Sequence, residues 1–260
     1  MSAADMFRRV LSELSVSYEV PDILLPSSDL IFILESPHVQ ELRFGAPVSG
    51  PSGATMTKHL FGERYARHAL GRLVKKNADE GKNRPRLNRI GLMNVCNVPM
   101  QMSAYPDPEV RQTYRIWLEA LMHIRSNNQR DVYPNALHNE VQSVLVDHLR
   151  AKLLALRDRP LTVVPCGRFA QKFFRLAAVR SERWRVIDGV PHPSYNSWDR
   201  PQYRNVVEQV RQALGNPPAS LPPEDAGQDP GITGSPAGHP GSGTASHSPA
   251  NHVHLARDLS

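Results

Sequence analysis

Short runs of apolar, mostly β-branched residues alternate along the chain with longer segments in which apolar residues recur at every third or fourth position. The short runs predict buried strands, and the longer segments predict amphipathic helices. The predicted strands are Asp29–Ile33, Arg89–Val95, Leu161–Cys166 and Trp184–Ile187, and the predicted helices are residues 2–16, Met56–Lys76, Glu109–Ile124, Val141–Leu156, Phe169–Ala177 and about Gln202–Leu214. Because strands alternate with helices, we expect an α/β fold: a three-layer α/β/α sandwich with a central, mainly parallel four-stranded sheet.

The composition of the chain changes after Leu214. Residues 215–260 are dominated by Pro, Gly, Ser, Ala and His and hold eight of the 23 prolines. A segment of this kind has too few apolar side chains to bury a core. We therefore expect one folded domain, residues 1–214, followed by a disordered tail, residues 215–260.

Charge is distributed unevenly between these two parts. The formal net charge is +6, and residues 215–260 carry −3, so residues 1–214 carry +9. A basic folded domain suits a polyanionic partner such as nucleic acid. Charge alone leaves open the alternative of a soluble basic protein without such a partner.

The chain shows no signal for a membrane or a secretory route, and its histidine-rich tail is interpreted as a spacer rather than a metal site. No apolar run approaches 18 residues, and the N-terminus lacks the apolar core of a signal peptide. Only Cys96 and Cys166 are present, too few for a disulfide framework or a four-cysteine metal site. We expect a cytoplasmic protein, a monomer, with reduced thiols and with neither cofactor nor metal.

Each predicted strand leads into a residue that could take part in catalysis or ligand binding. Glu35 follows the first strand, Asn94 ends the second, Gly167 follows the third and His192 follows the fourth. Since parallel strands end at the same edge of a sheet, a carboxylate, an amide and an imidazole are expected in one crevice. Taken singly, each has an ordinary structural alternative: a capping or ion-paired carboxylate, an asparagine in a turn, a histidine in a loop.

The spacing of these residues resembles that of a known family. The segment Glu35-Ser36-Pro37-His38-x-x-Glu41, continued by Gly45-x-Pro47-x-x-Gly50-x-x-Gly53, resembles the first motif of the uracil-DNA glycosylase superfamily in its thermophile-type branch. Gly91-Leu92-Met93-Asn94 resembles the strand whose last residue contacts the base. Val163–Gly167 with Ala170, and His192-Pro193-Ser194, resemble the two later motifs, so that all four occur in the family's order over residues 29–214.

The resemblance implies a DNA glycosylase, which hydrolyses the N-glycosidic bond of a nucleotide flipped out of the stack. Glu35 would position or deprotonate the water and stabilise the cationic sugar, and His192 would donate to a carbonyl oxygen of the leaving base. Tyr195 or Trp198 would fill the gap that the base leaves. The implied base-binding residues are Ser36, Pro37, Phe44, Val48 and Asn94, and the implied DNA-binding residues are Gly50, Ser52, Gly53, Gly167, Ser194 and Tyr195.

The chain departs from the family pattern in three respects. Ser36 stands where several branches have an Asp or Asn that handles the water, so that role falls to Glu35. Val48 replaces a Phe that stacks on uracil, which implies a wider pocket for a larger base or a substitute in Phe44. The two cysteines are too few for the iron–sulfur cluster of that branch.

Three functions remain in competition. The first is a DNA glycosylase that acts on uracil or a modified base, either in base-excision repair or in defence against phage DNA. The second is a binding module on the same fold that recognises damaged or modified bases without cutting. The third is a hydrolase of free nucleotides.

Overall fold

A computed structural model describes residues 1–218 of the chain. These residues form one α/β unit around the four-stranded sheet β2-β1-β3-β4, in which all neighbouring strands are parallel. The strands are β1 (Leu30–Leu34), β2 (Ile90–Asn94), β3 (Leu161–Pro165) and β4 (Trp184–Val186). The predicted fold class is thus confirmed, and the prediction of a disordered tail falls almost entirely on residues outside the described part.

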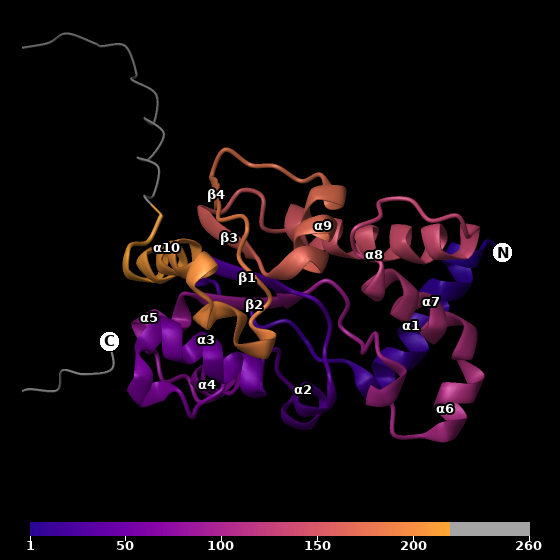
Figure 1. The fold of residues 1–260 in the computed structure, drawn as a ribbon, viewed down its shortest axis with the longest axis horizontal. Coiled ribbons are helices and arrows are strands. Elements are labelled where there is room, and N and C mark those ends of the chain that lie inside the picture. Colours follow the sequence, from indigo (N-terminus) through magenta and orange to yellow (C-terminus); the bar gives the residue numbers. More distant parts are fainter. Residues whose placement is uncertain (219–260) are drawn as a thin grey trace, which may run out of the picture. The chain divides into compact units, whose positions relative to one another are not determined.

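Helices cover both faces of the sheet (Figure 1). One layer packs on the core that includes Ile31 and Ile33, and the other packs on the core that includes Leu30, Phe32 and Leu34. Because successive side chains of a strand point to opposite faces, the continuous apolar run of β1 supplies both cores. The first layer contains α1 (Ala3–Tyr18), α7 (Arg115–Ser126), α8 (Ala136–Leu154) and α9 (Gly167–Ala177), and the second contains α3 (Pro51–Phe61), α4 (Leu70–Asp79), α5 (Pro85–Asn88) and α10 (Arg204–Gly215).

Shorter elements connect these layers. Two are α-helices, α2 (Val39–Phe44) directly after β1 and α6 (Pro108–Thr113) directly before α7. The others are 3-10 helices: η1 (Glu63–Tyr65), η2 (Met102–Ala104), η3 (Ser194–Asp199) and η4 (Pro201–Tyr203). The helices α2, η3 and η4 border the carboxyl edge of the sheet, where the site lies.

Two of the predicted helices are each broken in the structure. The predicted helix Met56–Lys76 is wrong as one element, because Gly62 adopts φ +101° and separates α3 from η1 and α4. The predicted helix Glu109–Ile124 is divided at Tyr114, whose ψ of 16° leaves the helical range. Apolar spacing continues through both breaks, so the hydrophobic pattern alone does not reveal them.

The helix predicted to start at Val141 begins earlier, at Ala136. The side chain of Asn135 caps it by accepting from the backbone N–H of Leu137 at 2.8 Å. This start lies inside residues 127–140, where the apolar pattern predicts neither a helix nor a strand. The N-cap is a short-range signal that was present in the sequence and was not used.

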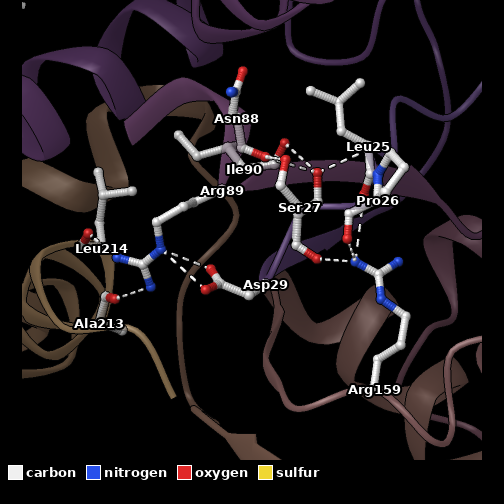
Figure 2. A network of polar contacts seen from close by, with 11 residues as sticks. Leu25, Pro26, Ser27, Asp29, Asn88, Arg89, Ile90, Arg159, Ala213 and Leu214 are labelled. Atoms are coloured by element: carbon white, nitrogen blue, oxygen red, sulfur yellow. Dashed lines mark hydrogen bonds and ion pairs between the residues drawn. The ribbon is translucent and has the colours of Figure 1, made fainter. Parts of the chain in front are cut away.

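Two arginines tie the amino edge of the sheet to the surrounding segments (Figure 2). Arg89 donates to Asp29 at 2.8 Å and to the backbone carbonyls of Ala213, at 3.0 Å, and Leu214 at the end of α10. Arg159, which precedes β3, donates to the carbonyl of Pro26 at 2.9 Å. These contacts satisfy helix-end and loop carbonyls that would otherwise lack donors, and they fix both the entry to β1 and the last helix.

Within residues 1–218, no helix is both long enough and apolar enough to cross a membrane.

Candidate active site

A cleft of about 950 Å³ lies at the carboxyl edge of the sheet. The register pairs Leu34 of β1 with Asn94 of β2 and Ile33 with Pro165 of β3, so the segments that follow these strands start at the same level. Glu35, Cys166, Gly167 and His192 all line the cleft. The structure therefore brings together three of the four strand-end segments that the sequence singled out.

Glu35 is held by an arginine from the helical layer. Its Oε1 accepts a hydrogen bond from Nε of Arg125, near the end of α7, and the two side chains are 16% and 35% exposed. The backbone carbonyl of Glu35 also accepts from Cys96 N–H at 3.1 Å, which extends the contact between β1 and β2 past the strand ends. Both the main chain and the carboxylate of Glu35 are thus fixed in place.

His192 is prepared to act as a neutral hydrogen-bond donor. Burial lowers its pKa below the ordinary value; the nearby Glu35 charge opposes that shift and Arg125 adds to it. Its Nδ1 accepts from the backbone N–H of Ser194 at 3.3 Å. Since one ring nitrogen of a neutral imidazole accepts and the other carries the proton, Nε2 is left as the donor.

Gly167 makes room for His192 at the base of the cleft. A Cβ at this position would lie 2.7 Å from the Cβ of His192, and Gly167 has φ +85°. Its N–H donates to the carbonyl of Val190 at 2.8 Å. The glycine after β3 is therefore required both by its backbone conformation and by the close approach of the His192 loop.

A hydroxyl contact joins the two loops that border the cleft. Ser52 Oγ, in the first turn of α3, lies 2.9 Å from Ser194 Oγ, which directly follows His192-Pro193. Residues 142 positions apart in the chain are thereby linked beside the catalytic candidates. Both hydroxyls line the cleft, where they are available to a ligand as donors or acceptors.

Glu41 shapes the loop that follows Glu35. Its two carboxylate oxygens accept from the backbone N–H groups of His38 at 2.7 Å and Val48 at 2.6 Å. Burial raises the pKa of Glu41 to about 7, the Glu35 charge adds to the rise, and the two hydrogen bonds oppose it. Val48 is thus held at φ +46°, a conformation that a β-branched residue rarely adopts.

Two glycines pack closely against the backbone of the same loop. A Cβ on Gly53 of α3 would lie 1.7 Å from the carbonyl oxygen of Val48, and a Cβ on Gly71 of α4 would lie 1.7 Å from that of Pro47. Gly71 N–H also donates to Val48 O at 3.3 Å. Only glycine allows the two helices to approach the loop this closely.

Nine of the thirteen predicted site residues line the cleft. The nine are Glu35, Ser36, Val48, Gly50, Ser52, Gly167, His192, Ser194 and Tyr195. The other four, Pro37, Phe44, Gly53 and Asn94, lie outside its lining. Gly53 packs against Val48, and the Phe44 ring lies under the guanidinium of Arg72, 4.2 Å from its centroid. Their roles toward a base or DNA stay predictions.

Asn94 is fully buried at the end of β2. Its backbone N–H donates to Asp22 at 3.0 Å and its carbonyl accepts from Lys152 at 2.9 Å. Both its side-chain amide atoms are without a hydrogen-bond partner among residues 1–218. A buried amide in this state is costly, because each unpaired polar atom has lost its hydrogen bonds to water.

Tyr195 and Trp198, the two aromatic residues considered as gap fillers, occupy opposite environments. Tyr195 is 91% exposed and has φ +56°, so its ring projects from a strained turn at the rim of the cleft. Trp198 is 1% exposed, and its indole N–H donates to the carbonyl of Pro191 at 2.9 Å. Of the two, only Tyr195 is accessible in this conformation.

Sequence reasoning missed two residues of this site. Glu41 was part of the quoted motif, and its spacing from Glu35 was the signal, but no role was assigned to it. Arg125 gave no usable signal, because it meets Glu35 across 90 positions of sequence. It lies one residue beyond the predicted end of its helix, on an element with no recognised counterpart in the motif pattern.

No group of three or more His, Cys, Asp or Glu side chains within residues 1–218 is arranged to hold a metal ion.

The family model described as the uracil DNA glycosylase superfamily matches residues 21–214. That range spans every strand and all the residues that line the cleft. The chain therefore belongs to the uracil DNA glycosylase superfamily, which implies a glycosylase-type activity on DNA. A search of curated proteins found no match to the chain.

Proposed function

We propose that the protein is a monofunctional DNA glycosylase that hydrolyses the N-glycosidic bond of a flipped-out uracil or modified base. The observation that carries the proposal is the meeting of Glu35 and His192 in one cleft, with His192 restricted to the form that donates through Nε2. Superfamily membership supports the class of reaction. Base-excision repair, or removal of modified bases from phage DNA, is the corresponding role.

In the proposed reaction, the bond between C1′ and the base nitrogen breaks and its electron pair leaves with the base. His192 Nε2–H donates to a base carbonyl oxygen and stabilises the developing negative charge. The Glu35 carboxylate faces the cationic sugar and orients a water whose oxygen bonds to C1′. The water proton passes to Glu35 or to solvent, and the departed base anion takes up a proton from solvent.

Val48 and Asn94 are the proposed determinants of base choice. Val48 lines the cleft with a side chain smaller than the Phe of the family pattern, which suits a larger or modified base. The unpaired amide of Asn94 has the donor and acceptor needed to contact a base edge. Its access to the base requires rearrangement at the floor of the cleft, since Asn94 does not line it here.

The test is release of free base from oligonucleotides that carry uracil, hypoxanthine, hydroxymethylcytosine or glucosylated hydroxymethylcytosine. We expect release from at least one, and loss of at least about 100-fold in rate in Glu35→Gln and in His192→Ala. Glu119→Gln, an exposed carboxylate on α7, is the matched control and should retain activity. Thermal unfolding should show that the site variants remain folded. A folded wild type that releases none of these bases would refute the proposal.

One observation favours the competing non-catalytic binding module. The Glu35 carboxylate is engaged by Arg125 and is followed by Ser36 rather than a second acidic or amide side chain. Salt-sensitive DNA binding without any abasic product would establish that alternative. Hydrolysis of free nucleosides without DNA would instead establish the third candidate, a nucleotide hydrolase.

A further inference from the structure

A second groove, of about 1240 Å³, adjoins the cleft along α9 and the edge strand β4. The two hollows share Asn128, Gln129, Arg168, Gln171 and Gly189, so they are continuous at the carboxyl edge of the sheet. Its lining also includes the turn between α9 and β4 and residues Arg157 and Asp158, which follow α8. None of the residues predicted from the family pattern lines it.

The groove is strongly basic. Its lining includes six cationic side chains, Arg157, Arg168, Lys172, Arg175, Arg180 and Arg183, against three acidic ones, Asp158, Glu182 and Asp188. Arg168 and Arg175 are exposed on α9, whereas Lys172, between them in the sequence, is buried. A surface of this length and sign suits a linear polyanion better than a compact ligand.

Three of these cations are uncommitted within the described residues. Arg175 is paired with Asp131 at 2.6 Å, Lys172 donates to Tyr133 Oη at 2.8 Å, and Arg183 donates to the carbonyl of Asp158 at 2.6 Å. By contrast, no ion pair or side-chain hydrogen bond involves Arg157, Arg168 or Arg180 in residues 1–218, and all three are exposed. Arg157 follows α8, Arg168 lies in the first turn of α9 and Arg180 lies in the turn between α9 and β4, so these guanidinium groups come from three segments.

We propose that this groove binds the nucleic-acid strand that flanks the excised nucleotide. The proposal rests on the proposed function, in that the flipped nucleotide occupies the adjoining cleft. The 11 residues of α9 span about 16 Å. At about 3.4 Å per stacked nucleotide, this length takes four to five nucleotides, whose phosphates pair with Arg168, Arg180 and Arg157.

The test uses undamaged single-stranded and duplex oligonucleotides, so that binding is measured without base excision. Dissociation constants are determined over a range of salt concentrations for wild type and for the double variant Arg157→Gln/Arg180→Gln. We expect weaker binding and a fall in the slope of log affinity against log salt of about 0.7 to 0.9 for each lost phosphate contact. Unchanged thermal unfolding should accompany the loss, since neither side chain has a protein partner among the described residues.

Arg9→Gln/Arg115→Gln is the matched control, because it removes the same charge from exposed arginines on α1 and α7 outside both hollows. An equal effect of both double variants would overturn the proposal, because it would show that DNA binding depends on the overall positive charge of the protein and not on the groove. Retained DNA binding in Arg157→Gln/Arg180→Gln, together with lost binding of an acidic peptide, would overturn it in favour of a protein partner. If wild type released no base but the slopes behaved as expected, the groove would stand and the proposed function would fail.

Discussion

At the scale of single residues, the contact between Glu35 and Arg125 decides what the carboxylate can do. A carboxylate at a strand end is free to turn, but one that accepts from a guanidinium is restricted to a narrow set of orientations. Arg125 reaches it from the last turn of α7. In the proposed reaction Arg125 is therefore a positioning residue that acts through Glu35.

Replacement of Arg125 by Gln tests this role. Loss of a charge-assisted hydrogen bond, worth about 1.5 to 3 kcal/mol, should slow base excision by about tenfold or more. Arg125→Lys keeps the charge without the planar guanidinium and should fall between wild type and Arg125→Gln. The measurement is the single-turnover rate, with Arg115→Gln on the same helix as the control. Full activity in Arg125→Gln would show that Glu35 keeps its position unaided.

At the scale of elements, the loop between α2 and α3 is shaped from three directions. Glu41 accepts from its backbone, Gly53 of α3 supports Val48, and Gly71 of α4 supports Pro47. The strain of Val48 at φ +46° persists because these contacts leave the loop no alternative conformation. Gly53, which belongs to the family motif, and Gly71, which does not, therefore both hold the loop that lines the cleft.

Gly53→Ala should destabilise the protein because the added methyl group meets the backbone oxygen of Val48 at 1.7 Å. We expect a loss of at least about 2 kcal/mol in the free energy of unfolding, as for other overpacked positions. Gly215→Ala is the matched control, since nothing lies within 4 Å of a Cβ there. Denaturant unfolding of both variants measures the difference. Equal stabilities would mean that the loop yields easily and that its conformation is not imposed by α3.

At the scale of the whole molecule, the pH dependence of stability combines opposing groups. Glu41 has a raised pKa of about 7, so its contribution is fully present below about pH 4.5 and is lost as pH rises through 7. His192, His138 and His148 have lowered pKa values, chiefly through burial. Below the ordinary histidine pKa the unfolded chain binds more protons at these sites, so their contribution is lost as pH falls.

Comparison with Glu41→Gln isolates the carboxyl group from the histidines. The free energy of unfolding of wild type minus that of Glu41→Gln should fall as pH rises from about 5 to 8. The histidine contributions are common to both proteins and cancel in the difference. Chemical denaturation at a series of pH values gives the two curves. Parallel curves would mean that Glu41 ionises in the folded protein as it does in the unfolded chain.

Much of the fold followed from local patterns in the sequence. The apolar runs located β1, β2 and β3, because a strand buried on both faces needs apolar residues throughout. The run at Trp184 located the edge strand β4, which is exposed at Arg185 and Val186. Alternation with helices specified a parallel sheet, and parallel strands by geometry place Glu35, Gly167 and the approach to His192 at one edge. The motif spacing indicated the family, which the match over residues 21–214 confirms.

Only the tertiary structure decided the contacts that cross the chain. Arg125 meets Glu35 through the packing of α7, and the basic groove gathers side chains from the segment after α8, from α9 and from β4 that no short-range pattern connects. The breaks at Gly62 and Tyr114 do not show in the apolar spacing, which runs through both. Burial, which shifts the pKa values of Glu41 and His192, is likewise a property of the assembled molecule. The sequence by itself determined which groups stand at the ends of the strands, and the fold determined their environment and their partners.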